Sequence, residues 1–134
     1  MIRQLVCTEG DLQEQARLLA ESLSLPFSDT PPDDPEELVL YFDESGIGLG
    51  LYKKGIKRSF IQVDFAAGKA NHRRKHGKNE GSDLIKAIGT DRGTVLDATA
   101  GLGQDGFVLA SLGYTVTLCE RHPVIRLLLQ DGLR

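Results

Sequence analysis

The sequence predicts an α/β fold, in which a small α+β domain precedes the opening β-α-β-α of a doubly wound parallel sheet. In the first half, three short apolar runs are separated by the turn residues Ser45-Gly46 and Lys54-Gly55, as in an antiparallel meander. From Thr94 onward, strand and helix patterns alternate, which is typical of parallel sheets. We therefore expect three parts: an α+β domain, a basic helical bridge and an incomplete sheet domain, at residues 1–66, 67–92 and 93–134.

The first domain is expected to open with a strand at residues 2–7 and a helix. The stretch from Thr8 to Asp11 resembles a capping box, and apolar residues then recur at helical spacing. The proline-rich residues 26–35 read as a loop, because proline lacks an N–H donor and restricts the residue before it. The periodic helix positions are Leu12, Ala16, Leu19, Ala20 and Leu23, and the meander strands are 38–44, 47–53 and 59–65.

The bridge carries a local excess of positive charge on a chain whose formal net charge is −3. Five Lys or Arg residues and no acid lie between Lys69 and Lys78. This asymmetry indicates a polyanionic partner, although a solvated basic helix would have the same composition. A second short helix is expected from Ser82, as N-cap, to Gly89, as C-cap.

The last part has the pattern of a ligand-binding βαβ unit. A strand at 94–98 leads into a turn containing Gly101 and Gly103, followed by a helix at 104–112, a strand at 114–120 and a helix from Pro123. Asp97 and Glu120 end the two strands, where ligands of such sheets bind. Glycine suits this turn because a side chain would block a ligand or disfavour a positive φ angle.

The acids favour S-adenosylmethionine over a dinucleotide as the ligand of this turn. Asp105 at the helix start would repel a pyrophosphate, whereas an ammonium and a sulfonium favour nearby carboxylates. Glu120 follows Asp97 by 23 residues, near the roughly 20-residue offset of a ribose-binding acid. The alternative is structural: Asp97 and Asp105 would cap the turn, and Glu120 would be a solvated strand end.

Other features indicate a protein without metal or membrane. Cys7 and Cys119 are expected to be reduced core thiols in strands, and the three histidines, His72, His76 and His122, lack accompanying metal ligands. No secretory leader is recognisable, and no apolar run approaches the roughly 18 residues of a spanning helix. We therefore expect a cytoplasmic location.

Three blocks of the chain resemble the RsmJ-type small-subunit ribosomal RNA guanine-N2 methyltransferases, a class I family that uses S-adenosylmethionine. The resemblance runs from about Gly46 to the end, and its blocks are VDFAAGKANHRRKHG, VLDATAGLGQDGFVLASLG and LCERHPVIRLLLQDGL. It implies a Rossmann-like methyltransferase sheet and methyl transfer to the exocyclic N2 of a guanine near the 3′ end of 16S rRNA. Gln104 stands where the family usually has arginine.

The resemblance also assigns site residues. It implies that Gln104, Asp105, Glu120 and Arg121 contact the cofactor. The strand and turn pattern described above adds Asp97, Gly101 and Gly103 to this set. It implies that the basic block binds rRNA or the small ribosomal subunit through Lys69, His72, Arg73, Arg74, Lys75 and Lys78.

The sheet pattern stops after two strands, and the downstream D-P-M-F-P segment of the family does not occur. We therefore expect a fragment that is inactive alone and prone to self-association, with the catalytic residues, which stay unknown, in the missing part. Two other functions stay open: a nicotinamide-dependent Rossmann oxidoreductase, and a noncatalytic RNA-binding module.

Overall fold

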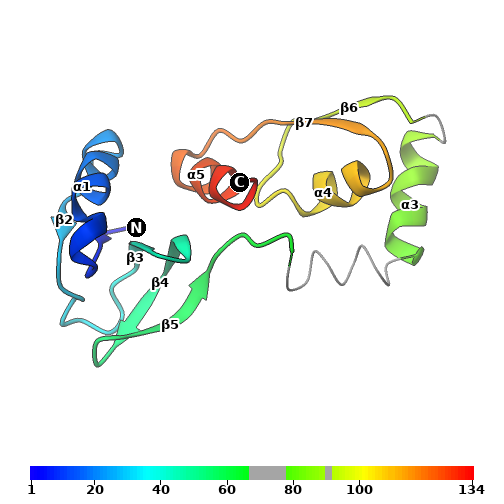
Figure 1. Ribbon diagram of the computed structural model, residues 1–134. Coiled ribbons are helices and arrows are strands. Elements are labelled where there is room, and N and C mark those ends of the chain that lie inside the picture. Colours follow the sequence, from blue (N-terminus) through cyan, green and yellow to red (C-terminus); the bar gives the residue numbers. More distant parts are fainter. Residues whose placement is uncertain (67–77, 90–91) are drawn as a thin grey trace. The chain divides into compact units, whose positions relative to one another are not determined.

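The computed structural model describes residues 1–66, 78–89 and 92–134 (Figure 1). The chain divides into two compact units, Met1–Gln62 and Val63–Arg134. The three-part division at residues 67 and 93 stays a prediction.

The first unit is a five-stranded mixed sheet in the order β2-β1-β3-β4-β5. β1 pairs in parallel with both β2 and β3, and β3, β4 and β5 form an antiparallel meander. The helix α1 follows a short 3-10 turn, η1, and connects β1 to β2. The bounds are β1 Leu5–Val6, η1 Gly10–Leu12, α1 Gln13–Ser22, β2 Phe27–Ser28, β3 Val39–Asp43, β4 Gly46–Lys53 and β5 Ile56–Ile61.

Two N-terminal predictions are wrong in detail. The region predicted as a loop, 26–35, contains the strand β2. The Leu5 N–H donates a hydrogen bond to the Pro26 carbonyl at 2.8 Å and so holds the start of this strand against β1. A two-residue strand has no periodicity to detect, so only its partner reveals it. The predicted capping box does not form, since neither η1 nor α1 has a side-chain hydrogen bond at its N-cap. Of the predicted helix positions, Ala16 and Ala20 are buried.

The predicted meander is confirmed, although its last strand is shifted. Lys54 and Gly55, with φ angles of 53° and 75°, form the two-residue turn between β4 and β5. Positive φ at both positions is typical of a type I′ hairpin turn, which matches the twist of the strands. β5 therefore starts directly after Gly55 and ends at Ile61, whereas the sequence predicted a strand at 59–65.

A buried cluster of four residues organises this sheet: Val6, Val39, Tyr41 and Tyr52. Gly48 faces Tyr41 across the β3–β4 pair, and a Cβ at Gly48 would lie 2.1 Å from the Tyr41 ring. The ring therefore fills the place of the missing side chain, which explains a glycine inside a strand.

The second unit contains the predicted β-α-β-α pattern. β6 and β7 pair in parallel from Thr94↔Thr115 to Asp97↔Leu118, and α4 connects them. Pro123 occupies the start of α5, as predicted. The bounds are α3 Lys78–Ile88, β6 Thr94–Asp97, α4 Gln104–Ser111, β7 Thr115–Leu118 and α5 Pro123–Gly132.

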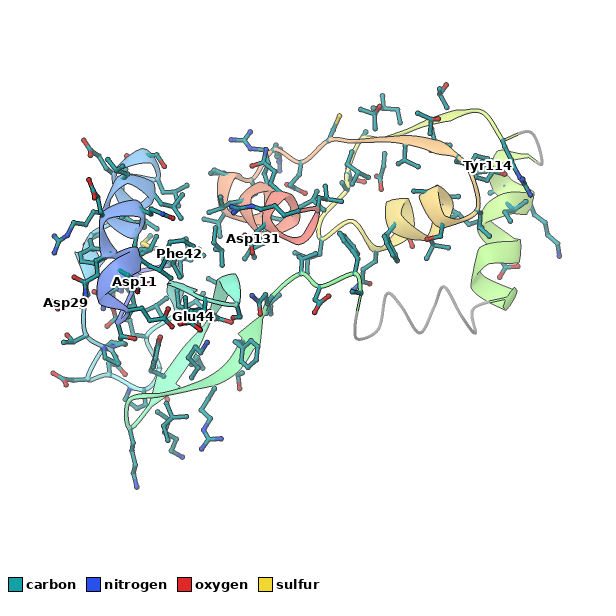
Figure 2. The ribbon with its side chains drawn as sticks, viewed as in Figure 1. Asp11, Asp29, Phe42, Glu44, Tyr114 and Asp131 are labelled. Atoms are coloured by element: carbon teal, nitrogen blue, oxygen red, sulfur yellow. The ribbon has the colours of Figure 1, made fainter. Side chains whose placement is uncertain are left out.

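The end of α3 is predicted correctly, but its start is not. Gly89 has a φ angle of 93°, and its N–H donates to the Ile85 carbonyl at 2.8 Å, so it terminates the helix as expected. Ser82 lies inside α3 instead of capping it. The Tyr114 hydroxyl donates to the Gly89 carbonyl at 2.8 Å and ties this helix end to the start of β7 (Figure 2). The other helix predicted in the bridge lies outside the described residues.

The core of the second unit includes the segment that follows β5. Phe65 and Leu129 are buried together, and Val63, Ala100, Phe107 and Leu118 pack against them. The rings of Phe65 and Phe107 stack with centroids 4.6 Å apart and an interplanar angle of 12°. Residues predicted as the end of a meander strand thus contribute to the core that carries the glycine turn. In the described residues, no helix is long and apolar enough to cross a membrane.

Candidate functional site

The site lies at the carboxyl ends of β6 and β7, the edge where parallel sheets of this type bind ligands. Asp97 is the last residue of β6. Beyond the strands, the Cys119 N–H donates to the Asp97 carbonyl at 2.8 Å, and the Ala100 N–H donates to the Cys119 carbonyl at 2.9 Å. These bonds bring the glycine turn against the segment that leads to Glu120.

The carboxylate of Glu120 connects the two segments. Its Oε2 accepts a hydrogen bond from the Gly101 N–H at 3.0 Å, and its Oε1 accepts one from the His122 N–H at 2.8 Å. The backbone N–H of His122, followed by those of Gly101 and Arg121, holds the pKa of Glu120 below its usual value. Glu120 is therefore not a solvated strand end, because it holds the glycine turn through charge-assisted bonds.

The two predicted glycines are required for different reasons. Both have positive φ angles, 55° at Gly101 and 77° at Gly103, which side chains disfavour. A Cβ at Gly101 would meet nothing within 4 Å, so the backbone there is open to a ligand. A Cβ at Gly103 would lie 2.5 Å from Leu129 Cδ1 and 3.2 Å from Phe65 Cζ. A glycine at Gly101 thus leaves the backbone accessible from solvent, and a glycine at Gly103 leaves space for the side chains of the core.

A third glycine was missed by the sequence reasoning. Gly106 is buried in α4, and a Cβ there would lie 2.4 Å from Leu118 Cδ2 of β7. It therefore allows the helix to pack closely on the strand. The spacing of Gly101, Gly103 and Gly106 is G-x-G-x-x-G, in which the third glycine has this packing role. That spacing was the signal that could have identified it.

The aspartates of the site differ in role. Asp97 Oδ1 accepts a hydrogen bond from the Thr99 N–H at 3.1 Å, so this carboxylate caps the turn, as the structural alternative expected. Asp105 lies in the first turn of α4, whose N-cap, Gly103, offers no side chain. Ala100, Leu102, Gln104 and Asp105 line a hollow of about 330 Å³. Gln104 and Asp105 thus border the open space next to the glycine turn.

The structure assembles only part of the predicted set. Arg121 is exposed directly after Glu120. Lys69, His72, Arg73, Arg74 and Lys75 lie outside the described residues, as does the side chain of Lys78.

The cysteine prediction is half right. Both thiols are free, but only Cys7 is buried. Cys119 is exposed. Neither cysteine lies inside a strand as predicted, because β1 ends at Val6 and β7 ends at Leu118.

The donor set of the site fits S-adenosylmethionine. Glu120 and Asp105 carry carboxylates, a group that can accept hydrogen bonds from ribose hydroxyls and attract ammonium and sulfonium groups. The open position at Gly101 lets a ligand approach the backbone. In the described ranges, no three His, Cys, Asp or Glu side chains are grouped as metal ligands.

Comparisons with known proteins identify the family. The family model of SAM-dependent methyltransferases (SAM_MT) matches residues 19–134. Ribosomal RNA small subunit methyltransferase J of Pseudomonas aeruginosa is 47% identical over 130 residues, covering 92% of this chain and 47% of that protein. The protein of the same name from Pasteurella multocida is 53% identical over 109 residues, which is 75% of this chain and 43% of its own.

A solved structure agrees with these sequence matches. A SAM-dependent methyltransferase from Neisseria gonorrhoeae aligns with a TM-score of 0.73 and 35% identity, covering 98% of this chain and 51% of that one. The chain thus spans about half the length of the relatives it matches. The predicted α/β methyltransferase fold and the predicted cofactor, S-adenosylmethionine, are confirmed by these findings. The chain belongs to the SAM-dependent methyltransferase family and is similar to its RsmJ-type members.

Proposed function

We propose that the whole protein transfers a methyl group from S-adenosylmethionine to the exocyclic N2 of a guanine near the 3′ end of 16S rRNA, in the cytoplasm. The observation that carries this proposal is the bond between the Glu120 carboxylate and the Gly101 N–H at the shared end of β6 and β7. It presents an acid and an open backbone turn at one point. The names of the relatives, ribosomal RNA small subunit methyltransferase J, support the choice of substrate.

The residues of this chain would bind and orient the cofactor. When bound, S-adenosylmethionine would supply its sulfonium methyl group, whose carbon bonds to the guanine N2 as its bond to sulfur breaks, and the amine loses a proton. Glu120 uses one lone pair of each oxygen for the backbone, and its other lone pairs can accept from the ribose hydroxyls. Asp105, beside the open turn, would face the positive charge. Correct positioning of the two reactants would supply much of the catalysis.

The basic block would hold the rRNA. Lys69, His72, Arg73, Arg74, Lys75 and Lys78 follow Phe65 closely in the chain, and Phe65 packs beside Gly103 in the core of the second unit. We assign the RNA phosphates to this block because of its concentrated positive charge. Five neutralised phosphates on single-stranded RNA would give a log–log salt slope of about −3 to −4.

Calorimetry with the 134-residue chain tests the cofactor site. We expect S-adenosylmethionine to bind, and Glu120→Ala to weaken binding about 10- to 100-fold, because hydrogen bonds to a charged acceptor are lost. Glu21→Ala, on the exposed surface of α1, is the matched control and should bind normally. Circular dichroism of both variants shows whether the fold persists.

Competing ligands separate the other functions. NADH binding in place of S-adenosylmethionine would identify an oxidoreductase and overturn the proposal. RNA binding with neither cofactor bound would identify a noncatalytic RNA-binding module.

Methylation itself requires a separate assay. Because the chain spans about half the length of its relatives, we expect it to be inactive alone on small ribosomal subunits. Mass spectrometry of rRNA nucleosides would detect N2-methylguanosine. Robust methylation by the 134-residue chain would contradict this expectation and place the catalytic groups within it.

A further inference from the structure

We infer that the β4–β5 hairpin of the first unit is a second RNA-binding surface, one that takes single-stranded RNA through cations and an exposed aromatic ring. This inference rests on the proposed function, because it assigns part of the RNA substrate to a surface outside the cofactor site. The hairpin comprises residues 46–61. It lies in a different unit from the glycine turn.

The positive charge of the first unit is concentrated on this hairpin. Between Ser45 and Val63 the chain has no acid, although residues 1–44 are rich in acids. Of the six Lys and Arg residues in the first unit, four lie between positions 53 and 58. A cationic surface on an otherwise acidic unit matches a polyanion better than a neutral or basic partner.

Three of these four cations are available to a ligand. Lys57 is engaged already, because it pairs with Asp43 and lies 4.2 Å from the centroid of the Tyr41 ring. Lys53, Lys54 and Arg58 are exposed, and none of them has an ion-pair partner in the part of the chain that the structure describes.

The strand register gathers these three cations. Lys53 lies opposite Ile56, and Leu51 lies opposite Arg58, so Lys53 and Arg58 project from the same face of the hairpin. Diagonal neighbours of this kind are about 7–8 Å apart. Lys54 follows at the turn. The hairpin thus presents a row of positive charge along one face and around its tip.

The same hairpin exposes an aromatic side chain. Phe60 is 53% exposed and contacts the Tyr41 ring edge-on at a centroid distance of 6.1 Å, so it lies on the face of the hairpin opposite to Lys53 and Arg58. Because β5 is an edge strand, an RNA strand that passes around this edge can reach both the cations and the ring. A β-bulge opposite Leu49 and Leu51 shifts the register here, and Ser59 adopts a positive φ angle of 49°. Bulges re-aim side chains next to functional sites, and left-handed backbone at a non-glycine residue has a conformational cost.

Lysines on an edge strand often serve only to prevent strand pairing with other molecules. That role does not explain why large apolar side chains, Ile56, Phe60 and Ile61, stay exposed on the same edge. Cations combined with an exposed aromatic ring are the usual means of holding single-stranded nucleic acid, since phosphates meet the cations and a base stacks on the ring.

Fluorescence anisotropy with a labelled, unstructured RNA of about 20 nucleotides tests the hairpin on the 134-residue chain. The triple variant Lys53→Ala, Lys54→Ala and Arg58→Ala should bind more weakly, and its log–log salt slope should be shallower by about 2, because three phosphate contacts are lost. Phe60→Leu keeps an apolar side chain of similar volume and should weaken binding about 5- to 100-fold without changing the slope.

A matched variant controls for net charge. Arg3→Ala, Lys86→Ala and Arg126→Ala removes three exposed cations elsewhere and should leave both affinity and slope close to those of the original chain. RNA affinities of the hairpin variants within about twofold of the original chain would overturn the inference. An acidic protein would then be the better candidate partner for this edge. If Phe60→Leu weakened binding of duplex RNA as much as binding of single-stranded RNA, the inference would also be overturned, since a paired base cannot stack on Phe60.

The cofactor titration separates this inference from the proposed function. Hairpin variants should bind S-adenosylmethionine normally. If the original chain bound no S-adenosylmethionine but lost RNA affinity through the hairpin variants, the proposed function would fail and the RNA surface would stand. If the original chain bound S-adenosylmethionine normally and the hairpin variants did not change RNA affinity, the proposed function would stand and the RNA surface would fail.

Discussion

Glu120 joins two segments that are 19 residues apart in the chain. One carboxylate receives hydrogen bonds from Gly101 and from His122, so the shape of the glycine turn depends on the charge of a side chain that follows the next strand. A role in ligand binding and a role in holding the fold therefore coincide in one residue. Substitution there affects both.

The pH dependence of stability should report this carboxylate. Since the hydrogen bonds lower the pKa of Glu120, its stabilising contribution is present above the unfolded value of about 4.5 and is lost as the pH falls through the folded pKa. Glu120→Gln should therefore be less stable than the original chain at neutral pH, and the difference should shrink in acid. Urea denaturation from about pH 7 to pH 3 measures it.

Glu21→Gln provides the comparison, because Glu21 is exposed on α1. It should track the original chain across this pH range. A Glu120→Gln deficit that persisted undiminished at the acid end would show that the carboxylate charge is not what holds the turn.

Gly101 and Gly103 form a matched pair for alanine substitution. Both variants should lose about 1–2 kcal/mol of unfolding free energy, because alanine disfavours the left-handed backbone. Gly103→Ala should lose about 1–3 kcal/mol more, since its Cβ would press on Leu129 and Phe65. Urea denaturation measures both. Equal losses would mean that the core yields to the added methyl group.

Short elements in this chain are stabilised by their partners more than by their own sequence. β1 has two residues and β6 and β7 have four each, so none of them has the length of an independently stable strand. The parallel pairs arise because a helix returns the chain to the same sheet. Gly106 permits this return in the second unit, because α4 can approach β7 closely.

The β4–β5 turn offers a test at this scale. Lys54 has a φ angle of 53°, which asparagine tolerates better than lysine, and Asn-Gly is the preferred pair for a type I′ turn. Lys54→Asn should therefore raise the unfolding free energy by about 0.5–1 kcal/mol. Lys53→Asn, inside β4, removes the same charge without this benefit and should not stabilise. Thermal denaturation of both variants checks the prediction.

At the scale of the whole molecule, the second unit has an incompletely covered sheet. Parallel sheets are normally buried on both faces, yet Leu96 in β6 is 66% exposed. Exposed apolar strand surface favours association between molecules.

Self-association should therefore depend on Leu96. Analytical ultracentrifugation should detect concentration-dependent association of the 134-residue chain, and Leu96→Glu should reduce the association constant about tenfold or more. Leu18→Glu is the matched control, because Leu18 on α1 is 63% exposed and lies in the other unit. Equal effects of the two variants would attribute the change to net charge.

The local pattern of the sequence predicted most elements of both units and the glycine turn between β6 and α4. Alternation of strand and helix patterns predicted the second unit, because each element obeys its own periodicity. The acids and glycines of the turn predicted its ligand class, since their chemistry is local. The resemblance to the RsmJ-type methyltransferases added the family, which the comparisons confirm.

Only the tertiary structure decided what depends on residues distant in the chain. The strand β2 exists through its partner β1, and the packing roles of Gly103 and Gly106 depend on Leu129 and Leu118. Glu120 binds the turn because β6 and β7 end side by side. Such contacts have no periodicity or spacing to detect, because the fold, and not the order of residues, brings their partners together.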